Sequence, residues 1–293
     1  MRKFVKLAAA ATVVMGISAP AFAEGTLALV VSTLNNPFFV TLKEGAEAKA
    51  EELGYDLLVL DSQNDPAKEL ANVEDVLNKD IALLLINPTD SDAVRSSIRA
   101  ANRAGVPVVT LDRGANGGDV LSHVASDNVQ GGMMAGELII ETLGGTGKVV
   151  ELQGVPGTSA ANDRGDGFNQ AINAAEGVEV VSSQTANFDR TQGLNVMENI
   201  LQAQSEIDAV FAHNDEMALG AIKAIEAANR SIIVVGFDGT DDAVAAVNEG
   251  TLLATVAQQA AMIGSLGVEA ANTILNGGKV PAYTPVSLQL ITK

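Results

Sequence analysis

The sequence contains no cysteine, and it has only two histidines among 293 residues. Without cysteine the chain can form no disulfide and no thiolate metal site, and it has no thiol nucleophile. His123 and His213 are too far apart in the sequence to form a metal-binding motif. We therefore expect no metal and no cofactor, and a fold that is stabilised by its hydrophobic core alone.

Basic residues are also scarce. Lysine and arginine number 18 against 36 acidic residues, so the formal net charge is −18. Three of the basic residues lie near the start, which leaves the remainder of the chain still more acidic. Nucleic acid and anionic membranes are consequently poor partners, whereas a neutral or cationic small molecule remains compatible with the charge.

Long apolar runs are confined to the N-terminus. Residues 1–23 begin with basic residues, continue with the apolar segment Leu7–Ile17 and end in Ala21-Phe22-Ala23. This order is typical of a signal peptide, and its core is too short to span a bilayer. An uncleaved amphipathic helix is the alternative. We predict cleavage before Glu24, and no membrane-spanning helix after it.

Thr26–Ser62 reads as one complete strand–loop–helix–strand unit. Leu27–Ser32 is a nearly continuous apolar run, as expected of a strand that is covered on both faces. In Phe38–Leu53 apolar residues recur every three or four positions, which predicts an amphipathic helix. Gly54 ends that helix, and Asp56–Leu60 is the next strand.

The same pattern recurs along the chain. Strands are predicted at Ile81–Ile86, Val106–Leu111, Gly147–Gln153, Val178–Ser182, Ile207–Ala212, Ile232–Gly236 and Leu253–Gln258. Two strand–helix–strand series result, one starting near Thr26 and one near Lys148. The fold class is therefore α/β, with two similar doubly wound domains of parallel sheet and right-handed crossovers.

The C-terminal tail, with the helix Ala260–Leu275 and an extended piece Val286–Ile291, gives each domain a further segment. The chain then crosses between the domains more than once. Such crossings form a hinge, and they place a cleft where the strand ends of both sheets converge.

Polar, charged and aromatic residues gather at these predicted strand ends. They are Asn36, Phe38, Phe39, Asp90, Asp112 and Arg113 in the first domain and Arg164, Phe188, Asn214, Asp215 and Asp238 in the second. Asp90 (or Ser91) and Asp215 could instead be helix N-caps, and Phe38 or Phe39 could be ordinary core. A charge against the end of an apolar strand is costly unless a partner meets it. Carboxylates, guanidinium groups, amides and aromatic rings together suit a neutral polyhydroxyl ligand.

Several segments carry a resemblance: ALVVSTLNNPFFVTLKEGA, LLINPTDSDAV, VVTLDRG, SDNVQGG, FDRTQGLNVMENIL, FAHNDEMALGA and VVGFDGT. The sequence resembles the periplasmic ribose-binding proteins of bacterial ABC uptake systems. The resemblance runs over the whole chain after the signal peptide. It implies a two-lobed fold in which residues 24–126 and 259–287 form one lobe and residues 127–258 and 288–293 the other, joined by a three-segment hinge.

The resemblance also implies a ligand and a set of contacts. The expected ligand is a monosaccharide, D-ribose first, with another pentose, a hexose or a signalling sugar as the alternative. The implied contacts are Asn36, Phe38, Phe39, Asp112, Arg113, Arg164, Phe188, Asn214, Asp238 and Gln258. The implied partners are a membrane permease and a chemoreceptor, and the implied state is a periplasmic monomer. Two positions depart from the pattern: His213 stands where glutamine is expected, and Gln259-Ala260-Ala261 where a proline is expected.

Two other classes are less consistent with the sequence. An enzyme would need a nucleophile, a metal cluster or a phosphate loop, and the glycine-rich stretch Gly144–Val149 lacks the first glycine of a P-loop. A sugar-responsive repressor would need a DNA-binding module at the N-terminus, where an export signal is predicted. The expectation is therefore a binding protein and not an enzyme.

Overall fold

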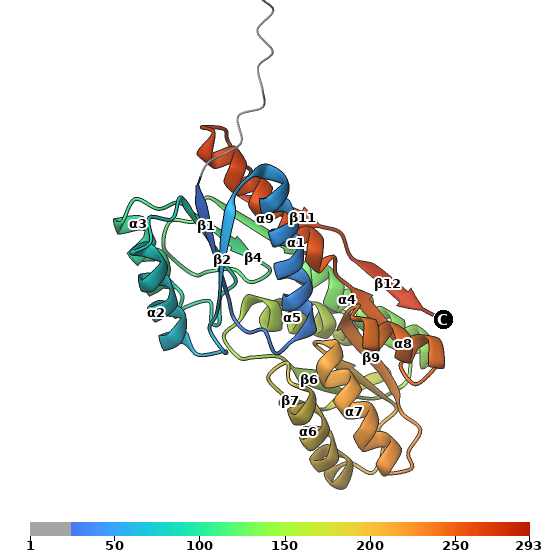
Figure 1. Cartoon of the computed structure of the whole chain (residues 1–293). Coiled ribbons are helices and arrows are strands. Elements are labelled where there is room, and N and C mark those ends of the chain that lie inside the picture. The colour runs from blue at the N-terminus through green and yellow to red at the C-terminus, as the bar shows by residue number, and fades with distance from the viewer. Residues whose placement is uncertain (1–24) are drawn as a thin grey trace, which may run out of the picture.

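The computed structural model describes residues 25–293, which form two α/β lobes arranged one above the other (Figure 1). The predicted signal peptide, residues 1–23, lies outside the described residues. Within them, no helix is long and apolar enough to cross a membrane.

The first sheet, which defines the first lobe, has the strand order β11-β5-β4-β3-β1-β2. Its strands are β1 (Thr26–Val31), β2 (Asp56–Asp61), β3 (Leu83–Ile86), β4 (Val108–Leu111), β5 (Ser122–Ser126) and β11 (Tyr283–Val286). All neighbours in it are parallel. Helices α1 (Pro37–Leu53) and α9 (Ala260–Leu275) cover one face, and α2 (Pro66–Leu77) and α3 (Arg95–Arg103) cover the other.

The second sheet, which defines the second lobe, has the order β12-β10-β9-β8-β6-β7. Its strands are β6 (Gly147–Gln153), β7 (Val178–Thr185), β8 (Ala209–Ala212), β9 (Ile233–Asp238), β10 (Ala254–Ala257) and β12 (Gln289–Thr292). Only β12 runs antiparallel to its neighbour. Helices α4 (Asn128–Thr142) and α5 (Ser159–Asn173) cover one face, and α6 (Arg190–Ala203), α7 (Asp215–Ala227) and α8 (Asp241–Glu249) the other.

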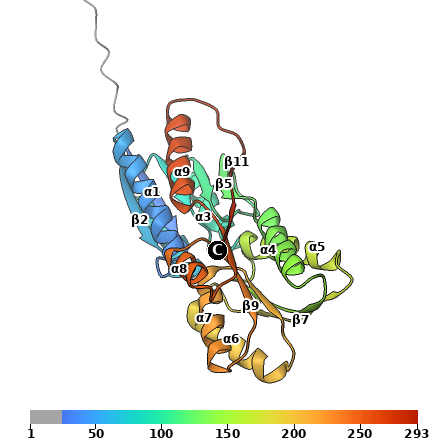
Figure 2. The same cartoon turned by 90° about the vertical axis from the view of Figure 1, so that its right-hand side faces the viewer.

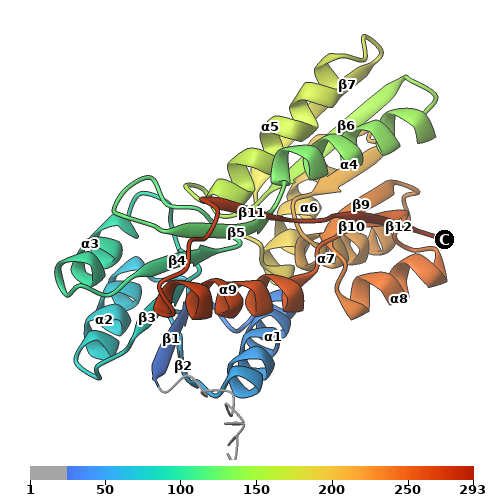
Figure 3. The ribbon, with the colours of Figure 1, turned by 90° about the horizontal axis from the view of Figure 1, so that it is seen from above.

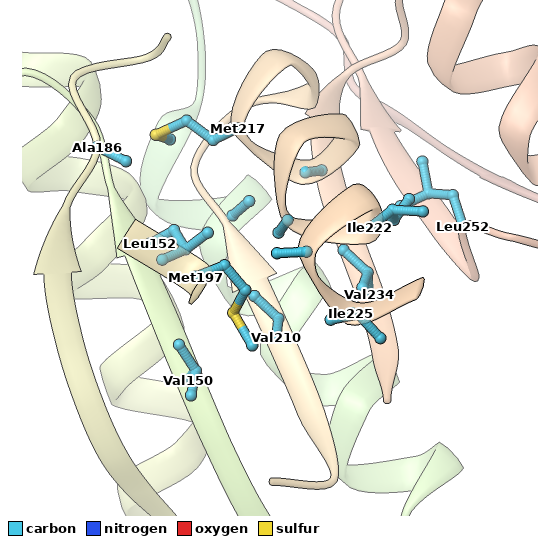
Figure 4. Packing of buried hydrophobic residues seen from close by; sticks show 14 of the residues in the cluster. Val150, Leu152, Ala186, Met197, Val210, Met217, Ile222, Ile225, Val234 and Leu252 are labelled. Atoms are coloured by element: carbon cyan, nitrogen blue, oxygen red, sulfur yellow. The ribbon is translucent and has the colours of Figure 1, made fainter. Parts of the chain in front are cut away.

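Each sheet is covered by helices on both faces, as the predicted fold class requires (Figure 2). Apolar strand residues supply the centre of each core. In the second lobe Val150 and Val210 meet Met197 of α6 and Ile225 of α7 in one cluster (Figure 4). The prediction of an α/β fold with two doubly wound sheets is confirmed.

The C-terminal tail differs in detail from the sequence expectation. The extended piece predicted over Val286–Ile291 is not one strand. It is the end of β11 in the first sheet and most of β12 in the second, separated by Ser287 and Leu288 (Figure 3). A strand cannot pair with both sheets at once, so the chain leaves one ladder before it enters the other.

The helix expected after Asp90 also begins later than predicted. Residues 91–94 form turns closed by bonds such as Ser96 N to Ala93 O, and α3 starts only at Arg95. Asp90 Oδ1 accepts hydrogen bonds from the amides of Asp92 and Ala93 at 2.8 and 2.7 Å. Asp90 therefore caps this turn, and the prediction of Asp90 or Ser91 as the helix N-cap is wrong.

Candidate binding site between the lobes

One pocket lies where the carboxyl ends of both sheets face each other. It is lined by Asn36, Phe38, Phe39, Asp112, Arg113, Ala160, Arg164, Phe188, Asn214 and Asp238. The structure thus brings together nine of the ten contacts that the resemblance implies.

The first lobe contributes the loop and first turn of α1. Asn36 is the N-cap of α1, and its Oδ1 accepts from the Phe38 amide at 2.9 Å. The rings of Phe38 and Phe39 meet edge to face with centroids 5.2 Å apart. Both rings belong to the hydrophobic core of the lobe and both line the pocket. The two alternatives for Phe38 and Phe39, core or site, therefore do not exclude each other.

Asp112 and Arg113 follow directly on β4. Asp112 adopts φ 61°, a left-handed conformation that is unusual for a non-glycine residue. Asn87 donates to Asp112 Oδ2 at 3.3 Å, and Arg113 Nη1 donates to the Pro88 carbonyl at 3.2 Å. The guanidinium carbon of Arg113 lies 5.1 Å from the centre of the Phe39 ring. Neighbouring strand ends therefore hold both charged groups in place.

The second lobe contributes Arg164 from α5. Arg164 Nε donates to Asn128 Oδ1 at 2.8 Å, and Nη1 donates to the His213 carbonyl at 2.6 Å. Its guanidinium carbon lies 3.8 Å from the centre of the Phe237 ring. Nη1 also approaches Asp238 Oδ1 at 3.5 Å. A flat cation held between an aromatic face and two carbonyl-type oxygens has little rotational freedom.

Three further residues complete this wall. Asn214 caps α7 through its Oδ1 and donates to the Phe188 carbonyl at 3.3 Å. Phe188 and Asp238 have φ of 57° and 122°, both in a region that side chains rarely adopt. Such strain persists only where the surroundings enforce it, and it clusters at functional positions.

Gln258 is the tenth predicted residue, and it does not line the pocket. Its Nε2 donates to Asp238 Oδ1 at 2.9 Å, so it reaches the site through that carboxylate. For Asp215 the sequence left two roles open, a site residue or a helix N-cap. It neither lines the pocket nor caps α7, whose N-cap is Asn214. It accepts from the amide of Thr240 at 2.8 Å and from Thr255 Oγ1 at 2.7 Å, and it thereby holds the loop that follows Asp238.

Burial shapes the electrostatics of the pocket. It raises the pKa of Asp112 against the attraction of Arg164 and Arg113, and it raises the pKa of Asp238 well above the usual range against Arg164. Burial also lowers the pKa of Arg113 to about 10, although Asp112 opposes the shift. Arg164 favours the ionised forms of Asp112 and Asp238 across this group, whereas the like charges oppose each other, Arg164 against Arg113 and Asp112 against Asp238.

Some polar atoms of this group have no hydrogen-bond partner among the described residues. They include Asp112 Oδ1, Arg113 Nε and Gln258 Oε1, and each is fully buried. A buried polar group without a partner costs roughly 1–3 kcal/mol. Asp112 Oδ1 and Arg113 Nε belong to residues that line the pocket, so they offer one acceptor and one donor to a polar molecule bound there.

The sequence reasoning missed the residues that support these side chains. Asn87 and Asn128 orient Asp112 and Arg164, and Phe237 lies beneath the Arg164 guanidinium. Asn128 lies within the segment SDNVQGG, which carries the family resemblance but predicts no role for this asparagine. For Asn87, the available signal was an amide side chain directly after the predicted strand Ile81–Ile86.

A direct contact between the lobes closes the rim of the pocket. Ser91 N donates to the Gly157 carbonyl at 3.0 Å, and Ser159 N donates to Ser91 Oγ at the same distance. Gly114 N donates to Ser159 Oγ at 2.8 Å. Loops of the two sheets thus meet beside the site, and the described conformation is a closed one.

Comparison with known proteins identifies the class. Residues 27–279 match the family model described as a periplasmic binding protein domain. The chain belongs to the periplasmic binding protein family. It is 56% identical over 293 residues to a ribose import binding protein of Haemophilus influenzae, covering all of both chains. A ribose import binding protein of Escherichia coli is also 56% identical, over 100% of this chain and 99% of its own.

A solved structure of the family has the same fold. The solute binding protein of an ABC transporter from Bacillus halodurans, with bound myo-inositol, superimposes with a TM-score of 0.88 at 32% identity. The match covers 94% of this chain and 96% of that one. As a periplasmic binding protein, the chain is a binding component and not an enzyme.

Proposed function

We propose that this periplasmic binding protein holds D-ribose in the pocket between its lobes and delivers it to the permease of an ABC importer. The observation that carries the proposal is the composition of the pocket. The pocket is lined by carboxylates, guanidinium groups and amides, together with aromatic rings from both lobes. Each sugar hydroxyl can donate to a carboxylate and accept from a guanidinium or an amide.

The relatives support the choice of sugar. Both proteins that are 56% identical to the chain are named ribose import binding proteins. The first alternative is a different neutral polyol, since the Bacillus halodurans relative was solved with myo-inositol at lower identity. Pentoses that differ at one hydroxyl would use the same donors and acceptors in another arrangement.

Calorimetric titration tests this proposal. The mature protein is unfolded, freed of carried-over sugar, refolded and titrated with D-ribose, other pentoses, hexoses and myo-inositol. We expect D-ribose to bind most tightly. Tighter binding of another sugar would replace ribose as the ligand, and no binding to any of them would overturn the proposed function.

The proposal includes the location and assembly of the protein. We infer export to the periplasm with removal of residues 1–23, lobe boundaries at 126/127, 258/259 and 287/288, and a monomer. A chemoreceptor is a second partner that would recognise the closed, loaded form. Mass spectrometry of the periplasmic protein should find Glu24 at the N-terminus, and a chain still beginning at Met1 would contradict the export step.

A further inference from the structure

Behind the pocket lies a buried pair that the proposed sugar contacts do not include. His213 directly follows β8 and Glu151 lies within β6, and both side chains are almost fully buried. His213 Nε2 lies 2.9 Å from Glu151 Oε1. Gly165 of α5 leaves room for the pair, because a Cβ there would lie 3.2 Å from Glu151 Oε1 and 3.3 Å from His213 Cε1.

The hydrogen bonds determine which ring nitrogen carries the proton. The amide of Gly154 donates to His213 Nδ1 at 3.3 Å, and a backbone amide can only donate. Nδ1 must therefore be unprotonated. Nε2 then carries the hydrogen and donates to Glu151, so the observed arrangement is that of a neutral imidazole beside a carboxylate.

Glu151 is ionised in this arrangement. Burial raises its pKa, but hydrogen bonds from His213, Ser183 and Asn169 outweigh that effect and leave the pKa below its usual value. Ser183 Oγ donates to Oε2 at 2.6 Å. The carboxylate is thus a fixed acceptor that orients the histidine ring.

His213 connects to the pocket through two routes. Gly154 packs directly on the Phe188 ring, so that a methyl group at Gly154 would overlap it. Phe188 lines the pocket and lies between Arg113 and Arg164, whose guanidinium carbons are 5.3 and 5.7 Å from its ring centre. The backbone carbonyl of His213 accepts from Arg164 Nη1. The position of the Phe188 wall thus depends on the bond between Gly154 and His213.

A second proton on His213 is incompatible with these contacts. Protonated Nδ1 would point an N–H at the N–H of Gly154, and one buried bond would become a repulsion between two donors. The charged groups that face the ring are Glu151 on β6, which favours the protonated form, and Arg164 on α5, which disfavours it. Burial is the largest effect and lowers the pKa of His213.

We propose that His213 is a positioning residue that holds Gly154 and, through it, the Phe188 wall, and that its protonation releases the sugar in acid. The inference rests on the proposed function. Sugar binding then favours neutral His213, so bound sugar lowers the pKa of this histidine. The affinity for sugar therefore falls as the pH drops through the pKa that His213 has in the sugar-free protein.

Two variants test the inference by calorimetry with D-ribose between about pH 8 and about pH 5. Glutamine at position 213 can accept from Gly154 and donate to Glu151 without titrating, whereas phenylalanine fills the space without hydrogen bonds. We expect His213→Gln to bind more tightly than His213→Phe at every pH. Going from pH 8 to pH 5, the wild type should lose affinity about tenfold more than His213→Gln, because Asp112 and Asp238 titrate equally in both.

Thr142→Ala is the control, since Thr142 Oγ1 donates to the Leu138 carbonyl within α4 and does not titrate. Its pH profile should follow that of the wild type. Superimposable profiles for the wild type and His213→Gln would overturn the inference and leave the proposed function standing. Failure of the wild type to bind D-ribose at pH 8 would overturn the proposed function instead.

A spectroscopic measurement does not depend on the variants folding. With only two histidines, the imidazole resonances of the wild type can be followed in an NMR pH titration with and without saturating D-ribose. We expect the apparent pKa of His213 to fall when ribose binds. An unchanged His213 pKa would contradict the proposed coupling.

Discussion

Arg113, Arg164 and Asp238 are the residues on which binding should depend most. Each is buried, charged and part of a hydrogen-bonded set that spans the pocket. Replacing any of them by alanine leaves a partner charge uncompensated, which costs roughly 2–5 kcal/mol of binding free energy. The affinity for D-ribose, measured by calorimetry, should therefore fall by about one and a half to three and a half decades.

Asp65→Ala provides the control for those variants. Asp65 is an exposed N-cap of α2 whose Oδ1 accepts from the Ala67 amide at 2.8 Å, and it lines none of the pocket. Its removal should lower the free energy of unfolding by about 1 kcal/mol and leave the affinity unchanged. Near-normal affinity in both arginine variants would contradict the proposed site.

The residues that were found and those that were missed differ in a physical way. Asp112, Arg113 and Asp238 could be predicted because a charged residue directly after an apolar strand can be recognised in the sequence alone. Asn214 and Asp215 are adjacent, and only the structure separates their roles, one capping α7 and the other holding Thr240. That choice depends on where a distant loop lies.

At the scale of elements, helices and strands with a regular apolar pattern could be predicted. The points at which the chain passes from one sheet to the other could not. The helix predicted over Phe38–Leu53 is α1, one residue longer, and Gly54 caps it with φ 80° as expected. The strands β11 and β12 were merged because two short extended pieces separated by two residues have one continuous sequence pattern. Pairing partners, which come from far along the chain, are what divide them.

Asp215 links two elements of the second lobe, and its titration should be visible in stability. Burial raises its pKa from the usual 3.8 to about 7, against hydrogen bonds from Thr240 and Thr255. The folded state then binds this proton more tightly than the unfolded chain. The contribution of Asp215 to the free energy of unfolding therefore falls as the pH rises from about 4 to about 7, at roughly 1.4 kcal/mol per unit.

Urea unfolding of the wild type and of Asp215→Asn over that pH range measures this contribution. The asparagine does not titrate, so the difference between the two free energies of unfolding reports Asp215 together with its effect on the pKa of Asp238. We expect the wild type to lose stability relative to the variant as the pH rises. A difference that is independent of pH would show that Asp215 has an ordinary pKa.

At the scale of the whole molecule, the division of the site between lobes implies motion. Asp112 and Arg113 belong to the first lobe, and Arg164 and Asp238 belong to the second. A ligand meets all four only when the lobes close around it, so binding energy favours the closed form. Small-angle scattering should show a smaller radius of gyration with saturating D-ribose. Tight binding without compaction would place the contacts in one lobe.

The rim contacts should influence affinity without touching the sugar. Ser159→Ala removes the acceptor for the Gly114 amide and thus weakens the closed form by about 1 kcal/mol. The affinity should fall about fivefold, because only the closed form satisfies the ligand. Thr142→Ala is the control, since Thr142 bonds only within α4, and its calorimetric affinity should equal that of the wild type.

The position of β11 and α9 has a consequence for how the chain is made. The first lobe obtains its edge strand and one covering helix from residues 260–286, and Tyr55 Oη donates to Asn272 Oδ1 across that distance. Contacts between distant parts of a chain form slowly, because a long loop must close before they contribute. The N-terminal half therefore cannot complete its core while the ribosome still holds the C-terminal residues. The first lobe can therefore reach its native core only after the last residues of the chain have been synthesised and released.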